Sequence, residues 1–291
     1  MAFEVWPGPM EGVGRGEFAQ AAIKLSLTGC WMTPFIRITE TIPSHSKLIK
    51  SVSAYLKSGV PVVVQLMGND PDLLGQCGKI LIDDPAVSGI NINMGCPSSR
   101  GVKHGSGGAM LKNPLILGEY CRKIASMLPG NRLSVKIRSG FSSADEMELI
   151  IPALLSSGVV EKIFFHYRTV LENYSPAPLA FREERIARAV QLCGSVPLIA
   201  NGDICSVDEA KNVMNKTGAS GVMIARPWLR DPYLLRRFFD PDTPDAEKGR
   251  GMFFEALKQS GINGGALVEL AKLLWGRDSE EFQQTVKEQF A

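Results

Sequence analysis

Residues 89–109 have the sequence GININMGCPSSRGVKHGSGGA, and the interpretation of the whole chain starts from them. Residues 89–94 resemble a strand that is buried on both faces. The strand leads into Gly95-Cys96-Pro97 and then into a segment too rich in glycine to continue as a helix or strand. Pro97 fixes its own φ angle and restricts the backbone of Cys96. A thiol at the mouth of a buried strand, beside a loop that allows close approach, indicates a reactive group.

Short apolar runs alternate with helix-length amphipathic segments along most of the chain, a pattern typical of βα units and a parallel sheet. The predicted strands span residues 3–6, 29–33, 60–66, 89–94, 133–137, 162–166, 197–200 and 221–225. The predicted helices span residues 17–27, 46–57, 70–82, 114–127, 144–157, 181–192, 207–216 and 231–239. This number of units in about 240 residues predicts an α/β fold of the (β/α)₈ TIM-barrel type. A doubly wound sheet ranks lower, because no G-x-G-x-x-G follows the first strand.

The pattern changes after residue 239. Residues 240–247, DPDTPDAE, are acidic and rich in turn formers, which is typical of a linker. Short helices are predicted at residues 252–258, 265–274 and 279–289. We therefore predict a barrel domain over residues 1–239 and a small C-terminal helical domain over residues 240–291.

Composition narrows the class of protein. The 291 residues are 45% hydrophobic and 8% aromatic, as in globular proteins with a large core. No apolar run approaches the roughly 20 residues that cross a bilayer, and the N-terminus does not resemble a signal peptide. The six cysteines are scattered without a C-x-x-C pair, and none of the three histidines lies in a metal-ligand motif. We expect a cytoplasmic, monomeric protein without a metal site, a disulfide or a membrane span.

Charge is distributed unevenly along the chain. Residues 240–291 hold six Lys and Arg against ten Asp and Glu, a net charge of −4, whereas residues 1–239 carry +6. A basic excess on the larger part is compatible with a polyanionic ligand. An ordinary solvated surface explains the same excess equally well.

Polar residues follow the predicted strands at the end where barrels of this kind carry their chemistry. They are Gln65, Asn93, Cys96, Lys136, Arg138, His166, Arg168, Asn201, Asp203 and Arg226. The ends of the last two strands are the usual phosphate site of such barrels, which predicts a phosphorylated ligand across this rim. Lys136 and Gln65 are then placed to address the polar edge of a flat ring, and a lysine there favours an anionic reduced flavin.

At these residues the chain resembles the tRNA-dihydrouridine synthases, which are FMN-dependent barrel flavoproteins. Asn91-Ile-Asn-Met-Gly-Cys-Pro97 followed by Gly107-Gly-Ala109 is the most specific part of the resemblance. The other matching segments occur in the same order as in the family: Pro9-Met-Glu-Gly-Val13, Val64-Gln-Leu-Met-Gly68, Ser134-Val-Lys-Ile-Arg138, His166-Tyr-Arg-Thr169 with Tyr174, Ala200-Asn-Gly-Asp203 and Gly221-Val-Met-Ile224.

The resemblance implies a reaction and a partner. Reduced FMN would deliver hydride to C6 of a uracil in tRNA after NADPH has reduced the flavin, and Cys96 would protonate C5. A thiol suits this role because it keeps its proton at neutral pH.

The resemblance also implies the roles of individual residues. Pro9 and Met10 would line the flavin ring, and Gln65, Lys136 and His166 would bind it. Asn93 and Arg168 would position the uridine. The ribityl chain and phosphate would lie against Asn201, Gly202, Asp203, Ala225 and Arg226.

The chain departs from the family pattern at two positions and leaves two other functions open. Tyr167 stands where glycine is usual, which predicts crowding of the flavin rim, and Ala225-Arg226-Pro227 stands where Gly-Arg-Gly is common, which predicts fewer N–H donors for the phosphate. One alternative is an FMN-dependent reductase of a small pyrimidine or enone, similar to dihydroorotate dehydrogenase. The other is an RNA-binding homologue without catalysis.

Overall fold

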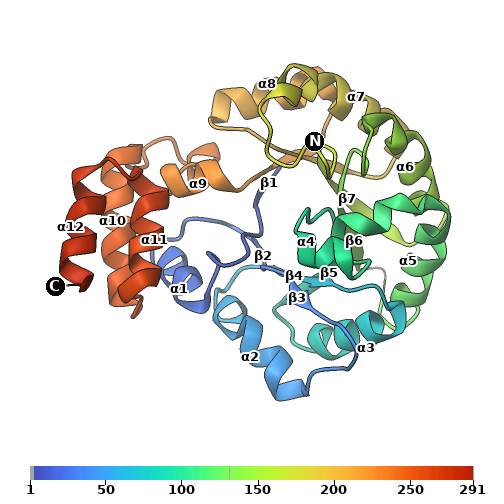
Figure 1. The fold of residues 1–291 in the computed structure, drawn as a ribbon, viewed down its shortest axis with the longest axis horizontal. Helices are drawn as coiled ribbons and strands as arrows, with labels where there is room; N and C mark the ends of the chain where they lie inside the picture. The colour runs from blue at the N-terminus through green and yellow to red at the C-terminus, as the bar shows by residue number, and fades with distance from the viewer. Residues whose placement is uncertain (1–2, 131, 291) are drawn as a thin grey trace.

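The computed structural model describes residues 3–130 and 132–290 of the chain, which form a ring of parallel strands surrounded by helices (Figure 1). The hydrogen-bonded order of the strands is β1-β9-β8-β7-β6-β5-β4-β2, with β3 also paired to β4. β1 and β2 lie at the two ends of this order and face each other across a seam, so the ring is nearly closed. Across this seam the Cys30 thiol donates to the carbonyl oxygen of Val5 at 3.5 Å. The predicted (β/α)₈ barrel is confirmed.

Each predicted strand is present, and one short strand is additional. The strands are β1 (Glu4–Pro7), β2 (Trp31–Met32), β3 (Ile36–Arg37), β4 (Val62–Met67), β5 (Val87–Met94), β6 (Leu133–Arg138), β7 (Val160–His166), β8 (Leu198–Asn201) and β9 (Gly221–Ile224). The additional strand is β3, which pairs with the end of β4 at Ile36 and Leu66. Pro34 separates it from β2, since proline cannot donate to a strand ladder.

The helices cover the outside of the barrel except for the short α4, which follows β5 and lies over the ring of strands (Figure 1). They are α1 (Gly16–Lys24), α2 (His45–Leu56), α3 (Pro71–Ile82), α4 (Ser99–Lys103), α5 (Leu117–Ala125), α6 (Met147–Leu155), α7 (Arg182–Cys193), α8 (Val207–Thr217) and α9 (Arg226–Arg230). The helix predicted at residues 231–239 is wrong: α9 ends before it, and only a 3₁₀ turn at Arg236–Phe238 lies within it. Pro227 in its first turn favours the early start of α9, and Pro232 opposes its continuation.

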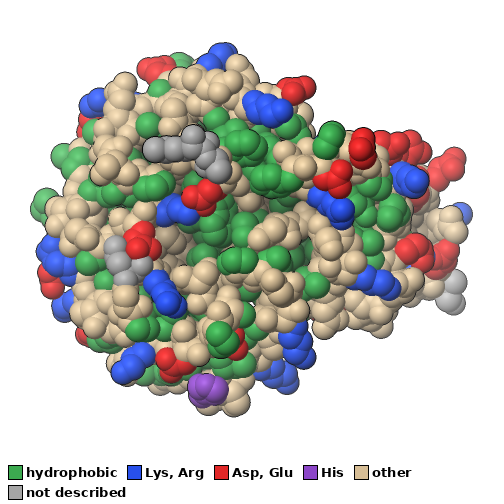
Figure 2. All heavy atoms as spheres, turned by 180° about the vertical axis from the view of Figure 1, so that it is seen from behind, with side chains coloured by type: hydrophobic (Ala, Val, Ile, Leu, Met, Phe, Trp, Pro, Cys, Tyr) green, Lys and Arg blue, Asp and Glu red, His purple; other side chains and the backbone are tan. Residues whose placement is uncertain are grey.

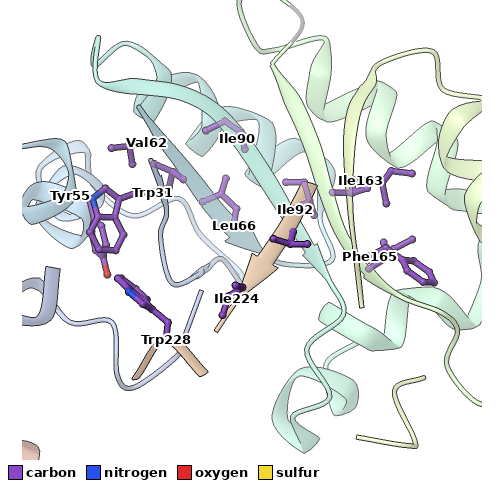
Figure 3. Packing of buried hydrophobic residues seen from close by; sticks show 14 of the residues in the cluster. Trp31, Tyr55, Val62, Leu66, Ile90, Ile92, Ile163, Phe165, Ile224 and Trp228 are labelled. Atoms are coloured by element: carbon purple, nitrogen blue, oxygen red, sulfur yellow. The ribbon is translucent and has the colours of Figure 1, made fainter. Parts of the chain in front are cut away.

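Side chains alternate between the two faces of the barrel wall because successive residues of a strand point to opposite sides. One set packs outward against the helices, for example Ile90, Ile163 and Phe165 (Figure 3). The other set forms a separate apolar plug inside the ring, composed of Trp6, Met32, Val63, Phe164, Ile199 and Met223. This plug separates the polar residues at the C-terminal ends of the strands from the Glu4–Lys162 ion pair at their N-terminal ends.

The chain ends in α10 (Ala246–Gln259), α11 (Gly264–Trp275) and α12 (Glu280–Phe290), which lie beside α1 and α9 (Figure 1). The Phe253 ring meets the Phe18 ring of α1 edge-on, with centroids 5.2 Å apart. Lys24 of α1 donates to the side chain of Gln259 at 2.5 Å. Acidic side chains gather over these C-terminal helices (Figure 2).

No helix within residues 3–130 and 132–290 is both long and apolar enough to span a membrane.

Candidate active site

A layer of polar side chains lies inside the barrel beyond the apolar plug. Side chains two residues apart on a strand share a face, so each of these polar residues follows a residue of the plug by two positions. The pairs are Val63 and Gln65, Phe164 and His166, and Ile199 and Asn201. Gln65, Asn91 and Ser134 occupy aligned positions on β4, β5 and β6. This polar layer lies on the C-terminal side of the plug, whereas on the N-terminal side Glu4 and Lys162 form a salt bridge at 2.6 Å.

Three neighbouring strands are joined by a directed chain of hydrogen bonds. Asn93 Nδ2 donates to Gln65 Oε1 at 2.9 Å, and Gln65 Nε2 donates to Asn91 Oδ1 at 2.8 Å. Asn91 Nδ2 donates to Ser134 Oγ at 2.9 Å, and Ser134 donates to the carbonyl oxygen of Ile90 at 3.3 Å. These groups are buried, so their mutual hydrogen bonds avoid the cost of unsatisfied polar atoms. The chain of bonds fixes the rotamer of Asn93.

Asn93 in turn holds the backbone of Cys96. Its Oδ1 atom accepts hydrogen bonds from the Gly95 and Cys96 amides at 3.1 and 2.9 Å. The Cys96 carbonyl oxygen accepts from the Gly108 amide at 3.0 Å. Gly107 has a φ of +62°, and a Cβ there would lie 3.2 Å from that of Cys96, so glycine is required for this approach. The partly exposed thiol is thus presented at the rim by a fixed turn.

Two basic residues on β6 and β7 lie in the interior beside this turn. Burial, followed by the charge of Arg138, lowers the pKa of Lys136 to about 7, although Cys96 acts in the opposite direction. The Lys136 ammonium makes no hydrogen bond or ion pair with any residue that the structure describes. At neutral pH the amine is close to this pKa, so an anionic group bound beside it would favour its charged form.

His166 supplies a neutral donor next to Lys136. Burial, followed by the positive charges of Arg138 and Lys136, holds the pKa of His166 well below its usual range. Its Nδ1 atom accepts from the Arg168 amide at 3.2 Å, which assigns the ring proton to Nε2. The ring is therefore an uncharged N–H donor.

The ends of β8 and β9 form the neighbouring part of the rim. Asn201 Nδ2 donates to the carbonyl oxygen of Met223 at 2.8 Å and joins the two strands. Gly202 follows with a φ of +117°, which only glycine adopts readily. Asp203 forms ion pairs with Arg168 and Arg226. Burial alone would raise the pKa of Asp203, but hydrogen bonds from Tyr167 and Arg168 and the charges of Arg168 and Arg226 lower it.

The prediction that Tyr167 crowds this rim is wrong. Its side chain is fully buried in the outer apolar core, together with Phe165 and Val170. Tyr167 lies just after β7, and its ring stacks on the His166 ring with centroids 5.4 Å apart. Its hydroxyl reaches the Asp203 carboxylate.

Pro9 and Met10 lie at the end of β1, beside the end of β9. A Cβ on Gly8 would come within 2.5 Å of that of Ala225, so the two segments touch. The structure therefore places most of the predicted residues around one rim. Arg226 is the most exposed of these, and Gln65 is fully buried with its amide bonded to Asn91 and Asn93.

Sequence reasoning overlooked Asn91 and Ser134. The signal was available, because Asn91 and Asn93 are two residues apart on one strand and hence share a face. Among residues 3–130 and 132–290, no group of three or more His, Cys, Asp or Glu side chains is arranged to hold a metal ion.

Comparison with known families fits this geometry. A sequence model described as "Dihydrouridine synthase (Dus)" matches residues 7–259. The chain belongs to the dihydrouridine synthase family. It is 30% identical over 228 residues to a tRNA-dihydrouridine(16) synthase of Cupriavidus necator, an alignment that covers 75% of this chain and 69% of that protein. It is also 30% identical to a human "tRNA-dihydrouridine(20a/20b) synthase [NAD(P)+]-like" protein, with 78% and 69% coverage.

Solved structures similar to this member of the family share its barrel. The old yellow enzyme of Trypanosoma cruzi superposes with a TM-score of 0.59 over 88% of this chain and 93% of that chain, at 11% identity. A variant of NCR from Zymomonas mobilis gives a TM-score of 0.58 over 84% and 90% of the two chains, at 15% identity. At these identities the likeness concerns the fold alone.

Proposed function

We propose that this dihydrouridine synthase family member reduces uridine to 5,6-dihydrouridine in tRNA, with FMN as cofactor and NADPH as reductant. The observation that carries the proposal is the partly exposed Cys96 thiol, held at the same rim as the Lys136 amine, which has no partner among the described residues. Family membership and the printed activities of the relatives support it.

The residues at the rim fit FMN. Lys136 has no partner among the described residues and would be held in its charged form by an anionic group, and His166 offers an uncharged N–H donor. A phosphate fits near the guanidinium of Arg226, beside the turn that Gly202 forms with its positive φ. The remaining flavin contacts that we propose are Pro9, Met10, Gln65, Asn201, Asp203 and Ala225. When bound and reduced by NADPH, FMN supplies a hydride for C6 of the uracil.

Cys96 completes the reduction by transferring its proton to C5 of the same ring. The C5–C6 double bond thereby becomes a single bond, each of the two carbons gains one C–H bond, and NADPH is oxidised to NADP⁺. Asn93 keeps the thiol in place by accepting hydrogen bonds from the backbone amides of Gly95 and Cys96. We propose that Asn93 and Arg168 also help to position the uridine, which must leave its stack to reach the barrel mouth.

We further propose that residues 1–239 form the catalytic domain and that residues 240–291 form a helical domain that contacts tRNA. The chain would act as a cytoplasmic monomer. The three C-terminal helices are anchored to α1 through Phe253, so they keep a fixed position relative to the barrel.

The flavin content of the purified protein and its substrate range test this proposal. We expect a yellow protein that forms dihydrouridine in tRNA lacking this modification when NADPH is supplied. Free uridine and orotate serve as competing substrates, and turnover of these alone would favour a small-molecule reductase. A colourless protein that FMN does not reconstitute would refute every flavoenzyme assignment and favour an RNA-binding role.

A further inference from the structure

Tyr167 links the end of β7 to the loop that follows β8. Its ring lies parallel to the His166 ring, at 11° with centroids 5.4 Å apart. Its hydroxyl donates to the Asp203 carboxylate. Burial, followed by the hydrogen bond to Asp203, raises the pKa of Tyr167, so the hydroxyl keeps the proton that it donates.

The Asp203 carboxylate is the centre of a small charged cluster. It also pairs with Arg168, whose side chain is 3% exposed, and with Arg226 at 3.3 Å. Asp203 itself has a φ of +49°, in the left-handed region that ordinary side chains disfavour. Its carbonyl oxygen accepts from Arg182 at 2.6 Å. The strained backbone of this loop is therefore held by contacts at both its side chain and its carbonyl.

The Tyr167 ring packs directly against the Cα atom of Gly202, where only glycine leaves room for it. A Cβ on Gly202 would lie 2.7 Å from that ring and 3.2 Å from the Cε1 atom of His166. The aromatic ring thus fills the space that a side chain would occupy and supports the backbone of Gly202 from the outer side. The buried face of the loop cannot shift without displacing Tyr167.

We propose that Tyr167 is a positioning residue: it fixes the Asp203 carboxylate and the Gly202 backbone, so that Arg168 and Arg226 are held in place for the uridine and the flavin phosphate. This inference rests on the proposed function. A loop organised before binding loses less entropy when the ligand binds, which strengthens affinity.

The test is Tyr167→Phe, which removes only the hydroxyl. FMN is titrated into the flavin-stripped full-length protein, and binding is followed by quenching of flavin fluorescence. We expect the Kd for FMN to rise about tenfold, the cost of one hydrogen bond to a charged group. Tyr120→Phe is the matched control, because its buried hydroxyl bonds to the carbonyl oxygen of Gly68 and not to Asp203. The control is expected to lower the melting temperature without changing the Kd.

A double-mutant cycle with Asp203→Ala separates positioning from general support of the fold. If Tyr167 acts through Asp203, adding Tyr167→Phe to Asp203→Ala weakens FMN binding by less than twofold, roughly the noise of such cycles. Additive losses, or a Tyr167→Phe protein that binds FMN as tightly as the wild type, would overturn the inference and leave the proposed function standing. Wild-type protein that binds no FMN would overturn both.

Discussion

At the scale of single residues, backbone hydrogen bonds place Cys96 at the rim. Its amide bonds to Asn93 and its carbonyl oxygen accepts from Gly108, so the thiol itself takes no part in holding the turn. Removal of the sulfur should therefore leave the turn intact. A substitution of Cys96 therefore tests the role of the thiol in the reaction and not its role in folding.

Lys136 gives a prediction on pH. Between pH 7 and the ordinary lysine pKa of 10.5, the unfolded chain binds a proton at this residue that the folded chain does not bind. The stability of the flavin-free protein should therefore rise with pH across this window. Lys136→Met removes this titration, so the variant should be more stable than the wild type at pH 7, by up to a few kcal/mol, and equally stable near pH 10.5.

Urea unfolding of the flavin-free protein at several pH values measures this difference. Lys57→Met, at an exposed position after α2, controls for the loss of one surface charge. A stability difference between wild type and Lys136→Met that stays constant with pH would contradict the prediction.

The site residues that end a strand could be predicted from the sequence, because parallel barrel strands bring their C-terminal ends to one rim. Cys96, Lys136 and His166 are of this kind. The direction of Tyr167 could not be predicted in the same way. It depends on which face the residue after β7 takes, and that is set by its contacts with Asp203 and the outer core.

At the scale of elements, the hydrogen-bond chain from Asn93 to Ser134 ties β4, β5 and β6 together inside the barrel. Asn91→Leu should remove the hydrogen bonds that Asn91 makes with Gln65 Nε2 and Ser134 Oγ. We expect a loss of about 1–3 kcal/mol in the free energy of unfolding, because both groups stay buried. Denaturant unfolding compared with Ser88→Ala, on the same strand but more exposed, measures the loss. An unchanged free energy of unfolding would contradict this account of the polar layer.

Sequence periodicity predicted these strands well and failed where local chemistry competes with it. The apolar runs at β4 to β9 are continuous enough to mark buried strands. The error at residues 231–239 arose because the apolar spacing there suits a helix. Pro227 instead favours a helix that starts directly after β9, and Pro232 ends it, so that α9 spans Arg226–Arg230.

At the scale of the whole molecule, the outer core continues from the barrel into the C-terminal helices through Phe18 and Phe253. Phe253→Ala should lower the free energy of unfolding by about 3–5 kcal/mol, since it removes a buried ring between α1 and α10. Phe290→Ala, at a position that is 68% exposed, is the control and should change stability little. Thermal or denaturant unfolding gives the comparison, and equal effects of the two changes would contradict a continuous core.

The central claim is that Cys96 is the proton donor of a dihydrouridine synthase. It is tested most directly by dihydrouridine formation in tRNA, measured by mass spectrometry, with Cys96→Ala beside Cys205→Ala, whose thiol is the exposed one. We predict that Cys96→Ala lowers the rate about 100- to 10,000-fold while NADPH still reduces the bound flavin, and that Cys205→Ala keeps the wild-type rate. A Cys96→Ala protein that forms dihydrouridine at the wild-type rate would contradict the claim.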